Sequence, residues 1–156
     1  MDTRTLSISS AWKKRVNSLK SVGIDAMCFI YLFEANPVFG PLSFFLFNLL
    51  EEKRLLGFTS VISLAEILSL PKLQQNRLAW EEEKQKFLQT PNLTIENVDG
   101  RICEAAALLR GKYGLHIPDA IQIVTAIFNR ADGFVTNDER LKKVKELPIL
   151  FMKDYI

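Results

Sequence analysis

Apolar residues recur along the chain with two alternating spacings. Short runs that are apolar, or that alternate between apolar and polar, predict β-strands, and longer stretches with an apolar residue every three or four positions predict helices. The predicted strands cover residues 22–25, 55–59, 93–98, 133–136 and 148–151. The predicted helices cover residues 28–34, 41–53, 61–70, 71–89, 99–112, 118–129 and 138–145.

Strands and helices follow one another in turn over most of the chain. Such an order favours right-handed crossovers and a sheet that is covered on both faces. The predicted fold class is therefore α/β, a three-layer α/β/α sandwich with a mainly parallel central sheet, formed by residues 21–156. Residues 1–20 are polar and basic, and we expect them to be an N-terminal extension with a short helix over residues 11–19, capped by Ser9 or Ser10.

Size and composition add limits to this prediction. A chain of 156 residues with 48% hydrophobic and 24% charged residues is typical of one ordered domain. Its longest apolar stretch, residues 38–50, is interrupted by polar residues and is too short for a bilayer, so we expect no signal peptide and no membrane partner. Cys28 and Cys103 have apolar neighbours and are predicted to be buried free thiols, which fits a cytoplasmic location.

Two aspartates lie at or near the carboxyl ends of predicted strands. Asp25 ends the first strand, and Asp138 lies two residues after the strand at 133–136. Ligands of open parallel sheets collect beyond the carboxyl ends of the strands, so these two side chains meet if their strands are neighbours. Each aspartate could instead cap the helix that follows it.

Two further acids lie in apolar helices. Glu66 is surrounded by apolar residues on almost every side of the helix at 61–70, and no Lys or Arg stands three or four positions away. A buried carboxylate needs a partner, which must then be an ion or another segment. Asp119 follows Pro118 at the start of a helix that is apolar nearly all round, which places it beside the sheet.

Four carboxylates in one place would repel each other strongly. Two unit charges 4 Å apart cost about 4 kcal/mol at an effective dielectric constant near 20, so cations are expected between them. Oxygen ligands select hard ions such as Mg²⁺ or Mn²⁺, which can activate water for attack on a phosphodiester. Asp25, Glu66, Asp119 and Asp138 together therefore predict metal-dependent hydrolysis at phosphorus.

Several short motifs resemble those of a known family. They are GID with FIYLFE at 23–25 and 29–34, TSVISLAE at 59–66, LRGKYGLHIPDAI at 109–121, and VTND at 135–138. In order and spacing they resemble the PIN-domain ribonucleases, particularly the VapC-like toxins. The resemblance implies that Asp25, Glu66, Asp119 and Asp138 bind metal, with Thr136 and Asn137 supporting them.

The same resemblance implies a function and partners. Members of the family are Mg²⁺- or Mn²⁺-dependent endoribonucleases that cut single-stranded or structured RNA, are often homodimers, and are in many cases neutralised by a small antitoxin. The chain departs from the pattern at Ala26, where the family usually has Thr or Ser. The alternative is a PIN-like module with weak or no activity that acts by binding RNA or protein.

Three points stay open from the sequence. A phosphoryl-transfer enzyme of another doubly wound family is disfavoured because Met27 stands where such phosphatases have a second aspartate and because the P-loop motif is missing. His116 is either a general acid or a loop residue near the substrate. The aromatic run Phe39, Phe44, Phe45 and Phe47 is either core or a groove for a partner.

Overall fold

A five-stranded parallel sheet forms the centre of the protein in a computed structural model that describes residues 8–156. The strands follow the order β3-β2-β1-β4-β5, and every neighbouring pair is parallel. Their bounds are β1 Ser21–Ile24, β2 Leu56–Ser60, β3 Leu93–Glu96, β4 Phe134–Thr136 and β5 Ile149–Phe151. The predicted α/β fold with a parallel sheet is confirmed.

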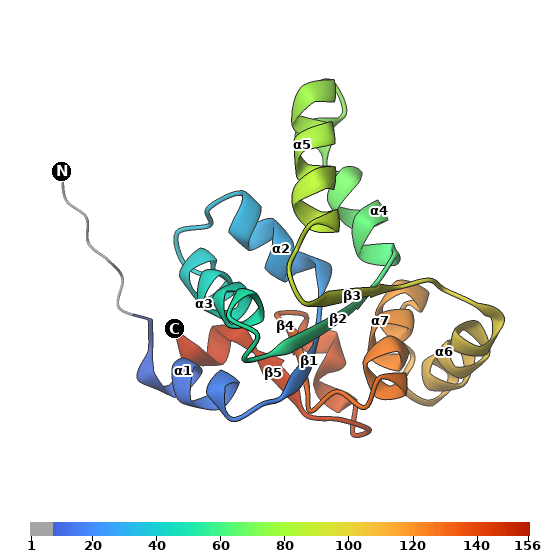
Figure 1. The fold of residues 1–156 in the computed structure, drawn as a ribbon. Coiled ribbons are helices and arrows are strands. Elements are labelled where there is room, and N and C mark those ends of the chain that lie inside the picture. Colours follow the sequence, from blue (N-terminus) through green and yellow to red (C-terminus); the bar gives the residue numbers. More distant parts are fainter. Residues whose placement is uncertain (1–7) are drawn as a thin grey trace.

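Helices lie on both faces of this sheet (Figure 1). The α-helices are α1 Ser10–Asn17, α2 Ala26–Phe33, α3 Gly40–Glu51, α4 Ile62–Leu68, α5 Arg77–Leu88, α6 Gly100–Tyr113 and α7 Ile117–Phe128. Short 3-10 helices span η1 Pro71–Leu73, η2 Glu139–Lys143 and η3 Met152–Tyr155. The helices α2 and α3 lie on one side of the sheet and α6 and α7 on the other, while α5 rises away from it at the top of the view. Over residues 8–156, no helix has the length and apolar character needed to cross a membrane.

The sheet separates two hydrophobic cores. Val135 in β4 packs into the core that contains Trp12 and Phe29, whereas its neighbour Phe134 packs into the core that contains Ile123. Successive side chains of a strand point to opposite faces, so this alternation places one core under α1, α2 and α3 and the other under α6 and α7. The three-layer arrangement follows from it.

Gly23 allows α7 to lie close against β1. A Cβ atom at this position would be 2.7 Å from the Cβ atom of Ala126 in α7 and 2.7 Å from Cδ2 of Phe134. Any larger residue would push the helix from the sheet. Since α7 begins near Asp119 and β1 ends before Asp25, this close approach helps to set the distance between the two acids.

The predicted helix over residues 71–89 is wrong as a single element. The chain forms η1, leaves the helical conformation at Asn76, and starts again as α5. The Asn76 side chain accepts a hydrogen bond of 3.1 Å from the backbone N–H of Ala79 and so caps the new helix. The prediction of one helix followed from Pro71, which suits the first turn of a helix, and residues 74–77 contain no Gly or Pro that would have marked the break.

The prediction that both cysteines are buried is half wrong. Cys28 is fully buried in α2, but Cys103 is exposed on α6. The α6 residues that face the core are Ile102, Ala106 and Leu109, and Cys103 lies outside this stripe.

The helix α1 packs into the main core rather than standing apart from it. Trp12 and Val16 have no exposed surface, and the indole Nε1 of Trp12 donates a 3.1 Å hydrogen bond to the carbonyl of Leu42. The Trp12 ring also lies 5.1 Å from the ring of Tyr155. The cap is Ser9, whose hydroxyl accepts from the backbone N–H of Trp12. The boundary predicted at residue 20 stays a prediction, and residues 1–7 lie outside the described part.

Candidate functional site

The carboxyl ends of the central strands β1 and β4 carry two of the predicted acids. The strands are paired in the register Gly23 with Phe134 and Ile24 with Val135. The backbone N–H of Asp25 extends this ladder by donating to the carbonyl of Val135 at 3.1 Å. Asp25 and the residues that follow Thr136 therefore lie at the same edge of the sheet.

The hydroxyl of Thr136 joins these two strand ends. It donates a 2.6 Å hydrogen bond to Oδ2 of Asp25 and accepts a 3.0 Å bond from the backbone N–H of Asp138. Thr136 has no exposed surface, so the bond to Asp25 is shielded from water. Of the two residues expected to support the acids, Thr136 thus contacts Asp25 directly.

Asn137 points to a different part of the protein. Its side chain donates to the hydroxyl of Tyr31 at 3.2 Å and accepts from the backbone N–H of Lys153 at 2.9 Å. These bonds tie the segment after β4 to α2 and to η3. The contribution of Asn137 is to hold the loop that carries Asp138, and a direct role beside the acids stays a prediction.

Asp25 is a buried carboxylate, with 7% of its surface exposed. In the part of the chain that the structure describes, its side chain makes no capping hydrogen bond to α2, although it stands at the capping position. The pKa of Asp25 is raised from 3.8 to about 6, mainly by burial and in addition by the charges of Asp119 and Asp138, while the hydrogen bond from Thr136 acts in the opposite direction. The capping alternative therefore does not describe Asp25.

Glu66 is half-buried in α4, and the negative charges of nearby acids affect its pKa. Burial is the main cause that raises its pKa from 4.5 to about 7, and the charges of Asp25 and Asp119 add to it. A carboxylate in α4 that responds to acids after β1 and in α7 must face the same edge of the sheet. The structure thus brings Glu66 toward Asp25 and Asp119.

A buried glutamine holds α4 in this position. Gln122 of α7 donates to the hydroxyl of Ser63 at 2.7 Å and accepts from the backbone N–H of Ser60 at 3.1 Å. Thr59 donates to the carbonyl of Ile24 at 2.9 Å and lies 2.6 Å from the Ser63 hydroxyl. This network joins the ends of β1 and β2 to α4 and α7, the elements that carry three of the four acids.

Asp119 and Asp138 share a cation that the sequence patterns did not reveal. Nη2 of Arg140 lies 2.6 Å from Oδ2 of Asp138 and 3.6 Å from Oδ2 of Asp119. Nε of Arg140 also donates to both oxygens of Asp138, at 3.0 and 3.1 Å. On its other side, Nη1 of Arg140 donates to Nδ1 of His116 at 2.6 Å.

The two acids respond differently to this guanidinium. Its hydrogen bonds lower the pKa of Asp138 below the usual range. Burial raises the pKa of Asp119, and the charge of Asp138 adds to this, while Arg140 acts in the opposite direction. Asp138 also accepts from the backbone N–H of Arg140 at 3.0 Å and so caps η2, as the alternative for this residue anticipated.

The acids fit a hard divalent ion in their chemistry, because all of their donor atoms are carboxylate oxygens. The positive charge next to Asp119 and Asp138 is at present the guanidinium of Arg140. As the side chains stand, however, no three Asp, Glu, His or Cys residues within the described range 8–156 are close enough to hold one ion. Metal binding would therefore require the acid side chains to move closer together, and both oxygens of Asp138 at present accept hydrogen bonds from Arg140.

Arg140 is the site residue that sequence reasoning missed. It lies two positions after Asp138, and that spacing brings no contact in a helix. In the tighter turn of η2 the side chain folds back on Asp138 and reaches His116, which stands at the capping position of α7. The one signal in the sequence is an arginine close to an acid that was already suspected.

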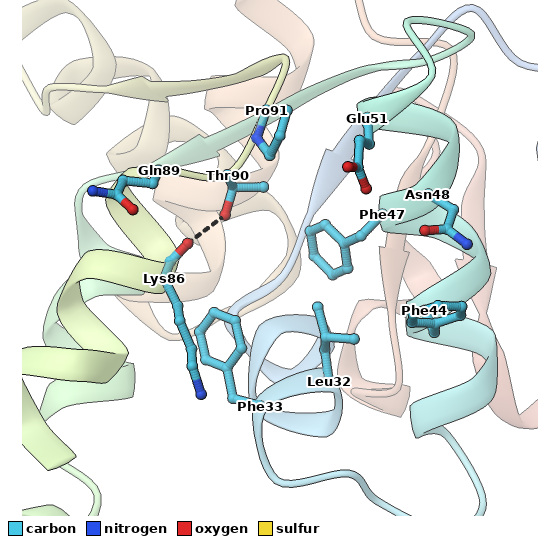
Figure 2. Close-up of a pocket in the computed structure, with 10 residues that line it drawn as sticks. All are labelled: Leu32, Phe33, Phe44, Phe47, Asn48, Glu51, Lys86, Gln89, Thr90 and Pro91. Atoms are coloured by element: carbon cyan, nitrogen blue, oxygen red, sulfur yellow. Dashed lines mark hydrogen bonds between the residues drawn. The ribbon is translucent and has the colours of Figure 1, made fainter.

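A second feature is an apolar groove between α2, α3 and α5 (Figure 2). It has a volume of about 480 Å³ and is lined by Leu32, Phe33, Phe44 and Phe47, with Glu51 and Lys86 among its polar neighbours. Phe47 is buried and its ring lies 4.9 Å from that of Phe29, whereas Phe44 is 56% exposed. The aromatic run is thus divided between the core and this groove.

Comparison with known proteins identifies the fold. The family described as PIN domain matches residues 23–147. No curated protein matches the chain significantly. Among solved structures, VapBC2 from Rickettsia felis, bound to a DNA fragment from its promoter, is 19% identical with a TM-score of 0.64, covering 84% of this chain and 98% of that one. A toxin-antitoxin complex from Klebsiella pneumoniae is 19% identical with a TM-score of 0.59, covering 85% and 98%.

Proposed function

The chain belongs to the PIN domain family, a family of nucleases, and on this basis we propose that it is a Mg²⁺- or Mn²⁺-dependent endoribonuclease. Asp25, Glu66, Asp119 and Asp138 are the residues proposed to hold the ion and to carry the reaction. When bound, the ion would supply Lewis-acid activation of water and of the phosphodiester. The substrate proposed is single-stranded or structured RNA.

The burial of Asp25 is the observation that supports this proposal most strongly. An ionised carboxylate away from water is costly unless it is compensated, and here the nearest acids raise its pKa instead of lowering it. A fold would retain such an arrangement at a strand end if a cation completes it. Thr136 fixes the orientation of the Asp25 carboxylate, and the network of Gln122 fixes the helix that carries Glu66.

Cleavage of single-stranded RNA in the presence of Mn²⁺ tests the proposal. We expect wild-type protein to cut, and Asp119→Asn to lose at least about a hundredfold in rate, because a carboxylate that holds the ion becomes a neutral amide. Asp154→Asn, a matched change at an exposed position, should leave the rate unaltered. Equal rates for wild type and Asp119→Asn would refute the enzymatic role, and activity that persists in excess EDTA would refute the metal mechanism.

The second candidate is a PIN-like module that binds RNA or protein and cuts poorly. It is favoured by Ala26, which is buried directly after Asp25 and offers no hydroxyl to orient a ligand or a water molecule. Ala26→Ser would restore this hydroxyl. A rate of cleavage that rises in this variant indicates a weakened enzyme, whereas RNA binding without cleavage in both proteins indicates a binding module.

We further propose that the protein is the toxin of a toxin-antitoxin pair. Both similar structures named above are toxin-antitoxin complexes, although at 19% identity they share only the fold with this chain. A small antitoxin would bind through apolar side chains in the groove between α2, α3 and α5, where Phe44 is exposed. A homodimer and a cytoplasmic location remain predictions from the family resemblance and the composition.

The proposal that the groove binds an antitoxin can be tested with a candidate antitoxin encoded by a neighbouring gene. Phe44→Glu should weaken the complex by at least about tenfold, because it places a charge against an apolar partner. Leu108→Glu, a matched change on the exposed side of α6, should not weaken it. Calorimetric titration of the purified proteins measures both, and equal affinities for the two variants would place the antitoxin elsewhere.

A further inference from the structure

The guanidinium of Arg140 lies between groups from two parts of the chain. It contacts Asp138 at the start of η2, and Asp119 and His116 at the start of α7. Three of its bonds to Asp138 are 3.1 Å or shorter and use both carboxylate oxygens. A fork of this kind is the strongest pairing that an arginine makes with a carboxylate.

These contacts compete with an ion at the same acids. A divalent cation bound through Asp138 needs the oxygen lone pairs that Arg140 now uses, and it would also repel the guanidinium over a short distance. The absence of a close group of three acids in residues 8–156 agrees with this competition, because Asp138 is directed toward Arg140. The arginine and the ion therefore exclude each other at this pair.

Arg140 is also free to move away. Its side chain is 55% exposed, compared with 18% for Asp119 and 17% for Asp138. The backbone at this point is a short 3-10 turn at the surface, so the side chain can turn into water without disturbing the core. Within residues 8–156, the contacts of the guanidinium are with Asp119, Asp138 and His116, so an ion that takes over the two acids would leave it without most of its partners.

We propose that Arg140 is a built-in competitor of the divalent ion, which occupies the Asp119–Asp138 side of the acidic site and must swing into solvent when the ion binds. This inference rests on the proposed metal site. Arg140 thereby sets the concentration of ion at which the site fills, and the protein stays in an ion-free form when divalent ions are scarce.

Mn²⁺ binding by the full chain tests this inference without reference to RNA cleavage. Free Mn²⁺ is counted by electron paramagnetic resonance during a titration of wild type, Arg140→Gln and Arg140→Lys at pH 7.5. We expect Arg140→Gln to bind Mn²⁺ about tenfold more tightly than wild type, the scale of one charge-assisted pair in competition. Arg140→Lys keeps the charge but loses the fork, and its affinity should lie between the two.

Two controls separate this effect from others. Lys143→Gln removes one positive charge from an exposed position of the same 3-10 helix and should bind Mn²⁺ as wild type does. Asp25→Asn should lose binding, which ties the signal to the acidic site. Circular dichroism confirms that each variant is folded.

The outcomes distinguish the inference from the proposed function. Tighter binding in Arg140→Gln but not in Lys143→Gln supports the competition. Affinities of wild type and Arg140→Gln that agree within about twofold, or weaker binding in Arg140→Gln, overturn it and leave the metal site intact. If neither folded wild type nor folded Arg140→Gln binds Mn²⁺, the proposed metal site fails, and the inference fails with it.

Discussion

Removing the charge of Asp25 should stabilise the protein when divalent ions are absent. The folded chain holds this carboxylate in a buried place beside other acids, which raises its pKa from 3.8 to about 6. Asparagine has nearly the same shape, carries no charge, and retains an oxygen that can accept the hydrogen bond from Thr136. We therefore expect Asp25→Asn to increase the free energy of unfolding at neutral pH.

The size and the direction of this effect follow from the pKa of Asp25. A rise from 3.8 to about 6 corresponds to about 3 kcal/mol of cost for the ionised form in the folded state. Below pH 3.8 both the folded and the unfolded chain carry the proton, and the cost is absent. Between 3.8 and about 6 the folded chain binds more protons, so stability falls by about 1.4 kcal/mol per pH unit as the pH rises. At pH values above about 6, the free energy of unfolding stays lower by the full amount of about 3 kcal/mol.

Urea denaturation in excess EDTA measures the effect. At pH 7.5 Asp25→Asn should be more stable than wild type by up to about 3 kcal/mol, and at pH 4.5 the difference should shrink to about 1 kcal/mol. Asp154→Asn, at an exposed position, is the matched control and should show no such change. The reasoning is refuted if Asp25→Asn is no more stable than wild type at pH 7.5, or if its gain is the same at both pH values.

Three further changes have predictable results. Thr136→Val removes the hydroxyl that joins the ends of β1 and β4. It should lower the free energy of unfolding, measured in urea, by about 1.5–3 kcal/mol, because the buried carboxylate of Asp25 loses its hydrogen-bond donor. An unchanged midpoint of urea denaturation would contradict this. Gly23→Ala would place a Cβ atom 2.7 Å from that of Ala126 and should cost about 1–3 kcal/mol in the same measurement, because α7 and β1 must then separate; an unchanged stability would contradict this. A thiol reagent should modify Cys103 in the native protein and Cys28 only after unfolding, as mass spectrometry of the labelled peptides would show.

The sequence was sufficient to predict most of the secondary structure. Strands buried on both faces and helices with one apolar stripe have distinct periods, so β1, β4 and α7 appear close to their predicted positions. The error at residues 71–89 has a local cause, because no Gly or Pro interrupts residues 72–89 while the capping side chain of Asn76 decides where α5 begins. Exposure of Cys103 depends on the rotation of α6 about its axis, which apolar neighbours in sequence do not fix.

The site was predictable only in part. Asp25 and Asp138 follow strands, and the general geometry of parallel sheets indicates where such residues collect. The partner of Asp138 could not be inferred in the same way, because Arg140 reaches it through the path of a 3-10 turn and reaches Asp119 through the packing of α7. The hydrogen-bond network of Gln122 could not be inferred from the sequence either, because its bonds join residues up to 63 positions apart.

The hydrogen bond between Thr136 and Asp25 spans 111 positions of the chain, and this has a consequence for the time at which the protein acquires its site during synthesis. Until β4 has been made, β1 can pair with β2 on one side but is an open edge on the other. Contacts between such distant residues form late, because a long loop must close first. A ribosome-bound chain that ends before β4 therefore lacks Thr136 and Asp138, and the hydrogen bond that orients Asp25 can form only after the chain has been made beyond these residues.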